Sequence, residues 1–236
     1  MKSATLGALL AERAAKRPVA LATNLTDGEE RLLYPDKLDG EPDADLAEAV
    51  RKAFHSDRSG PVETAAGTVF LHVFNPPLRL IVIGAVHITQ PLIRMAALAG
   101  YEVSVIDPRR SFATGERFPG VTLMDEWPDD GLEALALDAR TAVVTLTHDP
   151  KLDDPALDVA LNSAAFYIGA LGSKRTHAKR LERLKEAGFD AAALARIHGP
   201  VGLALGAKSP AEIAISILAQ VVQVYRQGAE RTRAAA

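Results

Sequence analysis

The feature that most constrains the fold is a strand–loop–helix–strand pattern near the middle of the chain. Residues 78–83 form a short apolar run rich in β-branched side chains, which is typical of a strand buried on both faces of a parallel sheet. The spacing predicts a helix over 87–99, closed by Gly100, and a second strand over 103–106. Asp107 follows that strand, about 20 positions after the glycine loop, where dinucleotide-binding folds place a carboxylate near a ribose. These residues predict a Rossmann-type scaffold.

The glycine loop keeps only the first glycine of the G-x-G-x-x-G pattern, because Gly84 is followed by Ala85, Val86 and His87. The second glycine normally lets a pyrophosphate approach the backbone, and Val86 places a branched side chain there. A helix start still offers N–H groups and a positive dipole end to an anion. The sequence predicts an anion site at Gly84, Ala85 and His87 and disfavours ordinary NAD binding. A crossover that binds nothing is the alternative.

The composition indicates a globular protein able to bury a core, with 236 residues of which 48% are hydrophobic and 24% charged. A net charge of −3 argues against a general nucleic-acid surface. The chain has no cysteine, so any sulfur chemistry linked to it belongs to a partner. No signal segment and no run long enough to span a bilayer is visible. We therefore expect a cytoplasmic location, without nucleic-acid or membrane partners.

The first part of the chain differs from the rest. Its patterning predicts a hairpin, a helix and a further strand, at residues 19–23 with 31–34, 43–54 and 68–74. The stretch Asn75-Pro76-Pro77 stiffens the chain and stops strand pairing. We therefore predict a small N-terminal α+β domain over 1–76 and a Rossmann-like domain over 77–236.

Predicted strands and helices alternate through this second domain. Strands are expected near 121–124, 141–147 and 165–171, and helices near 132–137, 155–161, 174–187 and 210–226. Ser209, Pro210 and Glu212 have the residue types of an N-cap, a first-turn proline and a capping box. The alternation predicts an α/β fold with a doubly wound parallel sheet.

Ligands of such sheets bind beyond the carboxyl ends of the strands. Polar or glycine-rich segments follow several predicted strands, among them Thr147-His148-Asp149, Gly172-Ser173-Lys174-Arg175 and the segment that begins at His198. The second segment joins a helix start to two cations, which predicts a phosphate cradle.

Plainer interpretations stay open. His148 and Asp149 can form an Asx-type turn that leads into a helix, and His87 can be a solvated residue at a helix start. Five cations lie within residues 174–183, and a run of this kind is most often a solvated helix face. A metal site of His87, His148 and His198 lacks any local ligand spacing, so we expect no metal.

Several segments, in this order, resemble the XdhC/CoxI family of accessory factors for molybdenum hydroxylases. The likeness runs from about Thr68 to the end of the chain. The segments that carry it are Phe74-Asn75-Pro76-Pro77, the Gly84 loop, Glu116-Arg117-Phe118-Pro119-Gly120, Thr147-His148-Asp149, Gly172-Ser173-Lys174-Arg175, Ile197-His198-Gly199-Pro200-Val201-Gly202 and Gly206-Ala207-Lys208-Ser209-Pro210.

The resemblance implies a non-catalytic chaperone that binds the molybdenum cofactor, a molybdopterin that can be a dinucleotide. Such a protein protects the cofactor and inserts it into an apo-enzyme of the xanthine dehydrogenase, aldehyde oxidoreductase or carbon monoxide dehydrogenase type. A cysteine desulfurase assists in that family, and we expect a homodimer. The implied roles are a ribose or pterin contact for Asp107, the border of the reactive end for Thr147, His148 and Asp149, and phosphate contact for Gly172, Ser173, Lys174 and Arg175.

Two departures keep alternatives open. Val86 stands where the family often has a glycine, and Ala204 where it often has an aspartate. One alternative is an NAD(P)-dependent oxidoreductase with Asp107 on the ribose and His148 as acid or base. The other is a diverged partner protein that has lost cofactor binding.

Overall fold

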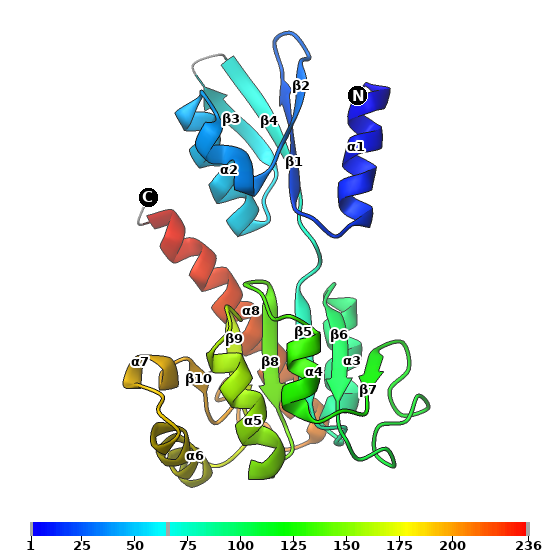
Figure 1. Cartoon of the computed structure of the whole chain (residues 1–236), viewed down its shortest axis with the longest axis vertical. Coiled ribbons are helices and arrows are strands. Elements are labelled where there is room, and N and C mark those ends of the chain that lie inside the picture. Colours follow the sequence, from blue (N-terminus) through cyan, green and yellow to red (C-terminus); the bar gives the residue numbers. More distant parts are fainter. Residues whose placement is uncertain (1, 65–66, 235–236) are drawn as a thin grey trace. The chain divides into compact units, whose positions relative to one another are not determined.

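The computed structural model describes residues 2–64 and 67–234, with side chains as far as residue 228. The chain divides into two compact units, one of Met1–Pro76 with Arg226–Ala236 and one of Pro77–Tyr225. Each unit is built on a sheet of its own (Figure 1).

The first unit contains an antiparallel sheet with the strand order β2-β1-β4-β3. The predicted hairpin is confirmed, since β1 pairs with β2 in a register that sets Ala22 opposite Arg31. Strand β3 was not predicted, and it lies at the edge of the sheet, where its proline, Pro61, is tolerated. The elements are α1 (Ser3–Ala14), β1 (Val19–Asn24), β2 (Glu30–Leu33), a 3₁₀ helix (Pro35–Gly40), α2 (Ala44–Ser56), β3 (Gly60–Thr64) and β4 (Gly67–Phe74).

The second unit contains a parallel sheet with the strand order β10-β9-β8-β5-β6-β7. Counted along the chain from β5, this is the 3-2-1-4-5-6 order of doubly wound dinucleotide-binding folds. The predicted α/β, Rossmann-like class is therefore confirmed. The strands are β5 (Arg79–Ile83), β6 (Glu102–Ile106), β7 (Thr122–Met124), β8 (Thr141–Thr145), β9 (Tyr167–Ala170) and β10 (Ile197–His198).

Helices cover both faces of this sheet (Figure 1). Successive residues of a strand point to opposite faces, and β5 is apolar on both. Leu80 and Val82 belong to the core that includes α3 and α8, whereas Ile81 and Ile83 belong to the core that includes α4, α5 and α6. The helices are α3 (Thr89–Leu98), α4 (Pro128–Ala134), α5 (Pro150–Leu161), α6 (Lys174–Glu186), α7 (Ala191–Leu194) and α8 (Pro210–Ala234).

Helix starts differ most from the prediction. Helix α5 begins at Pro150 instead of 155, because Asp149 caps it and Pro155 lies inside it. Helix α4 begins at Pro128 instead of 132, and the short α7 was not predicted. The capping box of α8 is confirmed, since Ser209 Oγ accepts from the Glu212 N–H and Glu212 Oε2 accepts from the Ser209 N–H.

Length and apolarity together rule out a bilayer-spanning helix among the residues that the structure describes.

Candidate functional site

The strand order places the loops after β5 and β8 side by side, at the point where the sheet reverses its winding. Gly84 ends β5 with φ +111°, and a Cβ there would lie 2.7 Å from Cγ2 of Thr147 in the loop after β8. Glycine is therefore required for the two loops to approach this closely. The candidate site is centred on these two loops, which we call the switch-point loops (residues 84–88 and 146–149).

Asp107 holds the first switch-point loop in place. Its side chain is 0% exposed, and Oδ2 accepts a hydrogen bond of 2.7 Å from the Ala85 N–H. The Arg109 guanidinium donates to both carboxylate oxygens at 2.8 Å. Burial alone would raise the pKa of Asp107, but the hydrogen bonds from Arg109 and Ala85 outweigh it and lower this pKa. The carboxylate is thus occupied within the protein, and its expected contact with a ribose or pterin stays a prediction.

Arg109 lies in the loop that follows β6, with its guanidinium carbon 4.8 Å from the Phe112 ring centre. Asp107, and more weakly Asp149 and Asp153, raise the pKa of Arg109. The side chain is held as a fixed cation next to the second switch-point loop.

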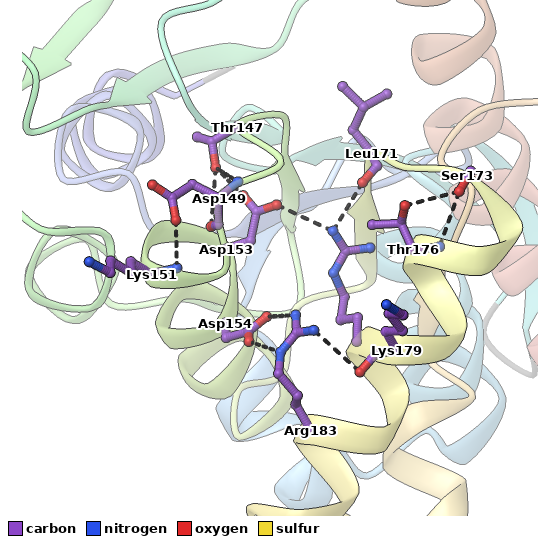
Figure 2. A network of polar contacts seen from close by, with 11 residues as sticks. Thr147, Asp149, Lys151, Asp153, Asp154, Leu171, Ser173, Thr176, Lys179 and Arg183 are labelled. Atoms are coloured by element: carbon purple, nitrogen blue, oxygen red, sulfur yellow. Dashed lines mark hydrogen bonds and ion pairs between the residues drawn. The ribbon is translucent and has the colours of Figure 1, made fainter.

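The second switch-point loop turns directly into α5 (Figure 2). Asp149 Oδ1 accepts from the Lys151 N–H at 3.0 Å, so the Asx-type turn is confirmed. Thr147 Oγ1 accepts from the Asp149 N–H at 3.1 Å and donates to Asp153 Oδ1 at 2.6 Å. His148 lies at the corner with φ +62° and an exposed side chain.

Asp153 also pairs with Arg180 of α6, and both side chains are buried. Asp153 is 1% and Arg180 2% exposed, and Arg180 Nη2 lies 3.3 Å from Asp153 Oδ2 and 3.0 Å from the Leu171 carbonyl oxygen. Burial raises the pKa of Asp153. The interpretation of the α6 cations as one solvated face is therefore wrong for Arg180. No motif in the sequence marks Asp153 or Arg180 as a site residue. The spacing of Arg180, four positions before the apolar Leu184, is the one signal that places it on the inner face of α6.

A cavity of about 240 Å³ lies beside this buried pair, between the start of α5 and residues 175–183 of α6. We call it the α5–α6 cavity. Two of the predicted site residues, His148 and Arg175, line this cavity. Its other lining residues were not predicted from the sequence. Its lining residues are His148, Pro150, Asp153, Arg175, Thr176, Lys179, Arg180 and Arg183.

The residues of the predicted phosphate cradle, 172–175, have different surroundings in the structure. Ser173 is the N-cap of α6, and its Oγ accepts from the Thr176 N–H at 3.1 Å. Lys174 and Arg175 are both exposed, but of the two only Arg175 lines the α5–α6 cavity. Gly172 lies in the turn before the cap.

The histidines considered as metal ligands have separate surroundings. His87 is exposed in the first switch-point loop, and His198 stacks on Tyr167 with ring centres 4.8 Å apart. Burial lowers the pKa of His198. Within the described ranges no group of three or more histidine or acidic side chains is placed to hold a metal ion.

Comparison with known proteins shows which family this chain resembles. A family model described as the XdhC Rossmann domain matches residues 80–221. The Escherichia coli (strain K12) protein YqeB is 36% identical over 159 residues, which are 67% of this chain and 29% of YqeB. The molybdenum cofactor insertion chaperone PaoD of the same organism is 32% identical over 151 residues, 64% of this chain and 41% of PaoD.

Two further proteins are similar. A probable xanthine dehydrogenase subunit of Bacillus subtilis (strain 168) is 31% identical over 160 residues, 67% of this chain and 46% of its own length. A Bacillus halodurans crystal structure described as a xanthine dehydrogenase superposes with a TM-score of 0.71 at 26% identity, over 95% of this chain and 64% of that chain. The matched regions thus span less than half of each of the curated relatives. With the Rossmann strand order and a match that covers more than half of the sequence, the chain belongs to the XdhC Rossmann domain family.

Proposed function

We propose that this protein binds the molybdenum cofactor and delivers it to an apo molybdenum hydroxylase. The observation that carries the proposal is the pair of switch-point loops, which Gly84 allows to approach closely, in a chain similar to a molybdenum cofactor insertion chaperone. Open parallel sheets bind their ligands at this position. The fixed cation of Arg109 and the exposed His87 and His148 supply polar groups around it.

The fold class is also compatible with a second function, that of a nicotinamide-dependent oxidoreductase. The surroundings of Asp107 disfavour that function. In dinucleotide-binding sheets the equivalent carboxylate accepts from a ribose hydroxyl. Here the Asp107 oxygens already accept from Ala85 and Arg109. A dinucleotide could use this carboxylate only by breaking charge-assisted hydrogen bonds, which contribute about 1.5–3 kcal/mol each.

The proposal extends to partners. We propose that the acceptor is an apo-enzyme of the xanthine dehydrogenase class, that a cysteine desulfurase supplies sulfur before insertion, and that the chaperone acts as a homodimer. A chain with no cysteine cannot itself carry a persulfide, so a separate sulfur donor fits this composition.

The first experiment is a release assay on the full chain, produced together with the enzymes of molybdenum cofactor biosynthesis. The purified protein is denatured, and the supernatant is oxidised and analysed for fluorescent pterin and for nucleotides. We expect pterin near one equivalent per chain. Pterin at that level would also show that Val86 and Ala204 are compatible with cofactor binding. NAD(P) without pterin, or neither molecule, would refute the proposal.

A matched pair of histidine variants locates the site. His87→Ala removes an exposed side chain of the first switch-point loop, whereas His55→Ala removes an exposed side chain near the end of α2 in the other unit. We expect the first to lower retained pterin about two- to tenfold, as for the loss of one hydrogen bond, and the second to leave it unchanged. Equal retention by both variants would contradict a site at the switch-point loops.

A further inference from the structure

Arg180, which lines the α5–α6 cavity, has hydrogen-bond donors that the protein itself does not use. Arg180 is 2% exposed, and only its Nη2 has partners, Asp153 and the Leu171 carbonyl. Its Nε–H and Nη1–H have no hydrogen-bond partner among the described residues. Leaving a buried donor unpaired costs about 1–3 kcal/mol, and more for a charged group. A guanidinium in this state, on the wall of a cavity, is placed to receive an acceptor from outside.

The charges around the cavity define that acceptor. Arg175, Lys179 and Arg183 join Arg180 in the lining, against the single carboxylate of Asp153. Arg183 is already engaged by Asp154, through bonds of 2.5 and 2.8 Å, so it is held in place at one wall (Figure 2). The remaining cations exceed what Asp153 can neutralise. We infer that the α5–α6 cavity binds the dianionic phosphate group of a phosphomonoester, with Arg180 as its buried donor and Arg175 and Lys179 at its mouth.

Size and donor geometry favour phosphate over a larger or simpler ligand. At about 240 Å³ the cavity is smaller than the roughly 300–1,000 Å³ of pockets that enclose a drug-sized ligand. It therefore takes one end group, not a whole pterin or nucleotide. A phosphate offers three acceptor oxygens and up to two charges, which matches an arginine fork and two further cations better than a carboxylate does.

The inference rests on the proposed function for the identity of the molecule that carries the phosphate. The cavity lies beside the second switch-point loop, since His148 belongs to both. A cofactor held at the switch point would have this cavity beside it, with room for a phosphate group. The chemistry is the same for a nucleotide phosphate or for free phosphate, so the test separates these sources.

Calorimetric titration of the full chain at constant ionic strength tests the site directly. The probes are inorganic phosphate, AMP and acetate. We expect phosphate to bind and acetate to bind at least about tenfold more weakly. Tighter binding of AMP than of phosphate would support the site with a nucleotide as the carrier, and equal binding would support recognition of the phosphate alone. Acetate binding as tight as phosphate binding would overturn the assignment. A phosphate titration that shows only the heat of dilution, and therefore no binding, would overturn it too.

Variants on α6 show whether the binding is in the cavity. Arg175→Ala should weaken phosphate binding about tenfold, and Arg180→Lys, which keeps the charge beside Asp153 but loses the free N–H groups, by at least as much. Lys185→Ala removes an exposed cation in the last turn of α6, outside the cavity, and should change affinity less than twofold. Equal affinity in all three variants would overturn the inference. Phosphate binding by protein that retains no pterin would refute the proposed function and support this one.

Discussion

The backbone N–H of Ala85 donates a 2.7 Å hydrogen bond to Oδ2 of Asp107, across the carboxyl ends of two neighbouring strands. The bond joins the first switch-point loop to the next strand, and Arg109 completes the carboxylate's partners. Asp107 is therefore a positioning residue for the loop that follows Gly84.

Replacing this carboxylate should destabilise the protein. Asp107→Asn keeps the shape but turns one acceptor oxygen into a donor that faces Ala85 or Arg109. We expect the free energy of unfolding in urea to fall by about 1.5–3 kcal/mol, the range for a charge-assisted hydrogen bond. Asp125→Asn breaks an exposed pair with Arg110 and should cost less than about 1 kcal/mol. Equal losses in the two variants would contradict this role for Asp107.

The close approach of Gly84 to Thr147 predicts that a substitution at Gly84 is destabilising and that a second substitution at Thr147 partly restores stability. Gly84→Ala forces a side chain onto φ +111° and sets its Cβ against Cγ2 of Thr147. We expect a loss of at least about 1–3 kcal/mol in urea unfolding. Thr147→Ser deletes that methyl and keeps the hydroxyl that bonds Asp153, so the double variant should recover part of the loss.

A glycine in open surroundings serves as the control. Gly7 lies in α1 with nothing within 4 Å of the position that a Cβ would take, so Gly7→Ala should stabilise the protein by about 0.5–1 kcal/mol. Destabilisation by Gly84→Ala that Thr147→Ser cannot relieve at all would argue against the contact.

The buried pair of Asp153 and Arg180 should show strong coupling. Arg180→Met leaves a buried carboxylate without its cation, and we expect a loss of about 3–5 kcal/mol. Asp153→Asn in the same chain removes the unpaired charge, so the double variant should be less destabilised than the sum of the single variants. A double-mutant cycle by urea unfolding measures this difference, and additive losses would show that the two side chains act independently.

Two half-buried histidines, His177 and His198, should make stability depend on pH. Burial lowers the pKa of His198, and burial with the charge of Arg180 lowers that of His177. Below pH 6.5 the unfolded chain takes up protons that the folded chain does not, so stability falls as the pH falls from that point. Each histidine contributes a slope of at most about 1.4 kcal/mol per pH unit.

His198→Phe isolates one of these contributions. The phenyl ring can keep the stack on Tyr167 but does not titrate. Urea unfolding between pH 7.5 and 5 should therefore show a shallower decline in the variant than in the wild-type chain. Identical slopes would contradict a lowered pKa at His198.

Much of the Rossmann-like unit could be predicted, because its buried strands are continuous apolar runs and its helices have glycine or capping boundaries. The start of α5 was misplaced, since two prolines, Pro150 and Pro155, both fit a helix start and only the Asp149 cap decides between them. Strand β3 was missed because Pro61 is unusual in a strand away from a sheet edge, and the sequence does not show which strands are edges.

The sequence predicted the residues of the candidate site that follow strands, but not those that lie on helices. Residues that follow strands could be found from topology, which places the Gly84 loop and Thr147 together. Asp153 and Arg180 lie on different helices, and their pairing depends on how α5 packs against α6. An arginine on a highly charged helix usually predicts solvent exposure, and the four-residue spacing of Arg180 to Leu184 is only a weak signal of burial.

The caps of α5 and α6 make the two neighbouring helix starts chemically unequal. Helix α5 begins with the carboxylate of Asp149, whereas α6 begins with the neutral hydroxyl of Ser173 followed by Lys174 and Arg175. An anion that approaches this edge is repelled at one helix and attracted at the other. A molecule with one anionic and one neutral end would therefore bind at this edge in one orientation, with its anionic end toward the start of α6.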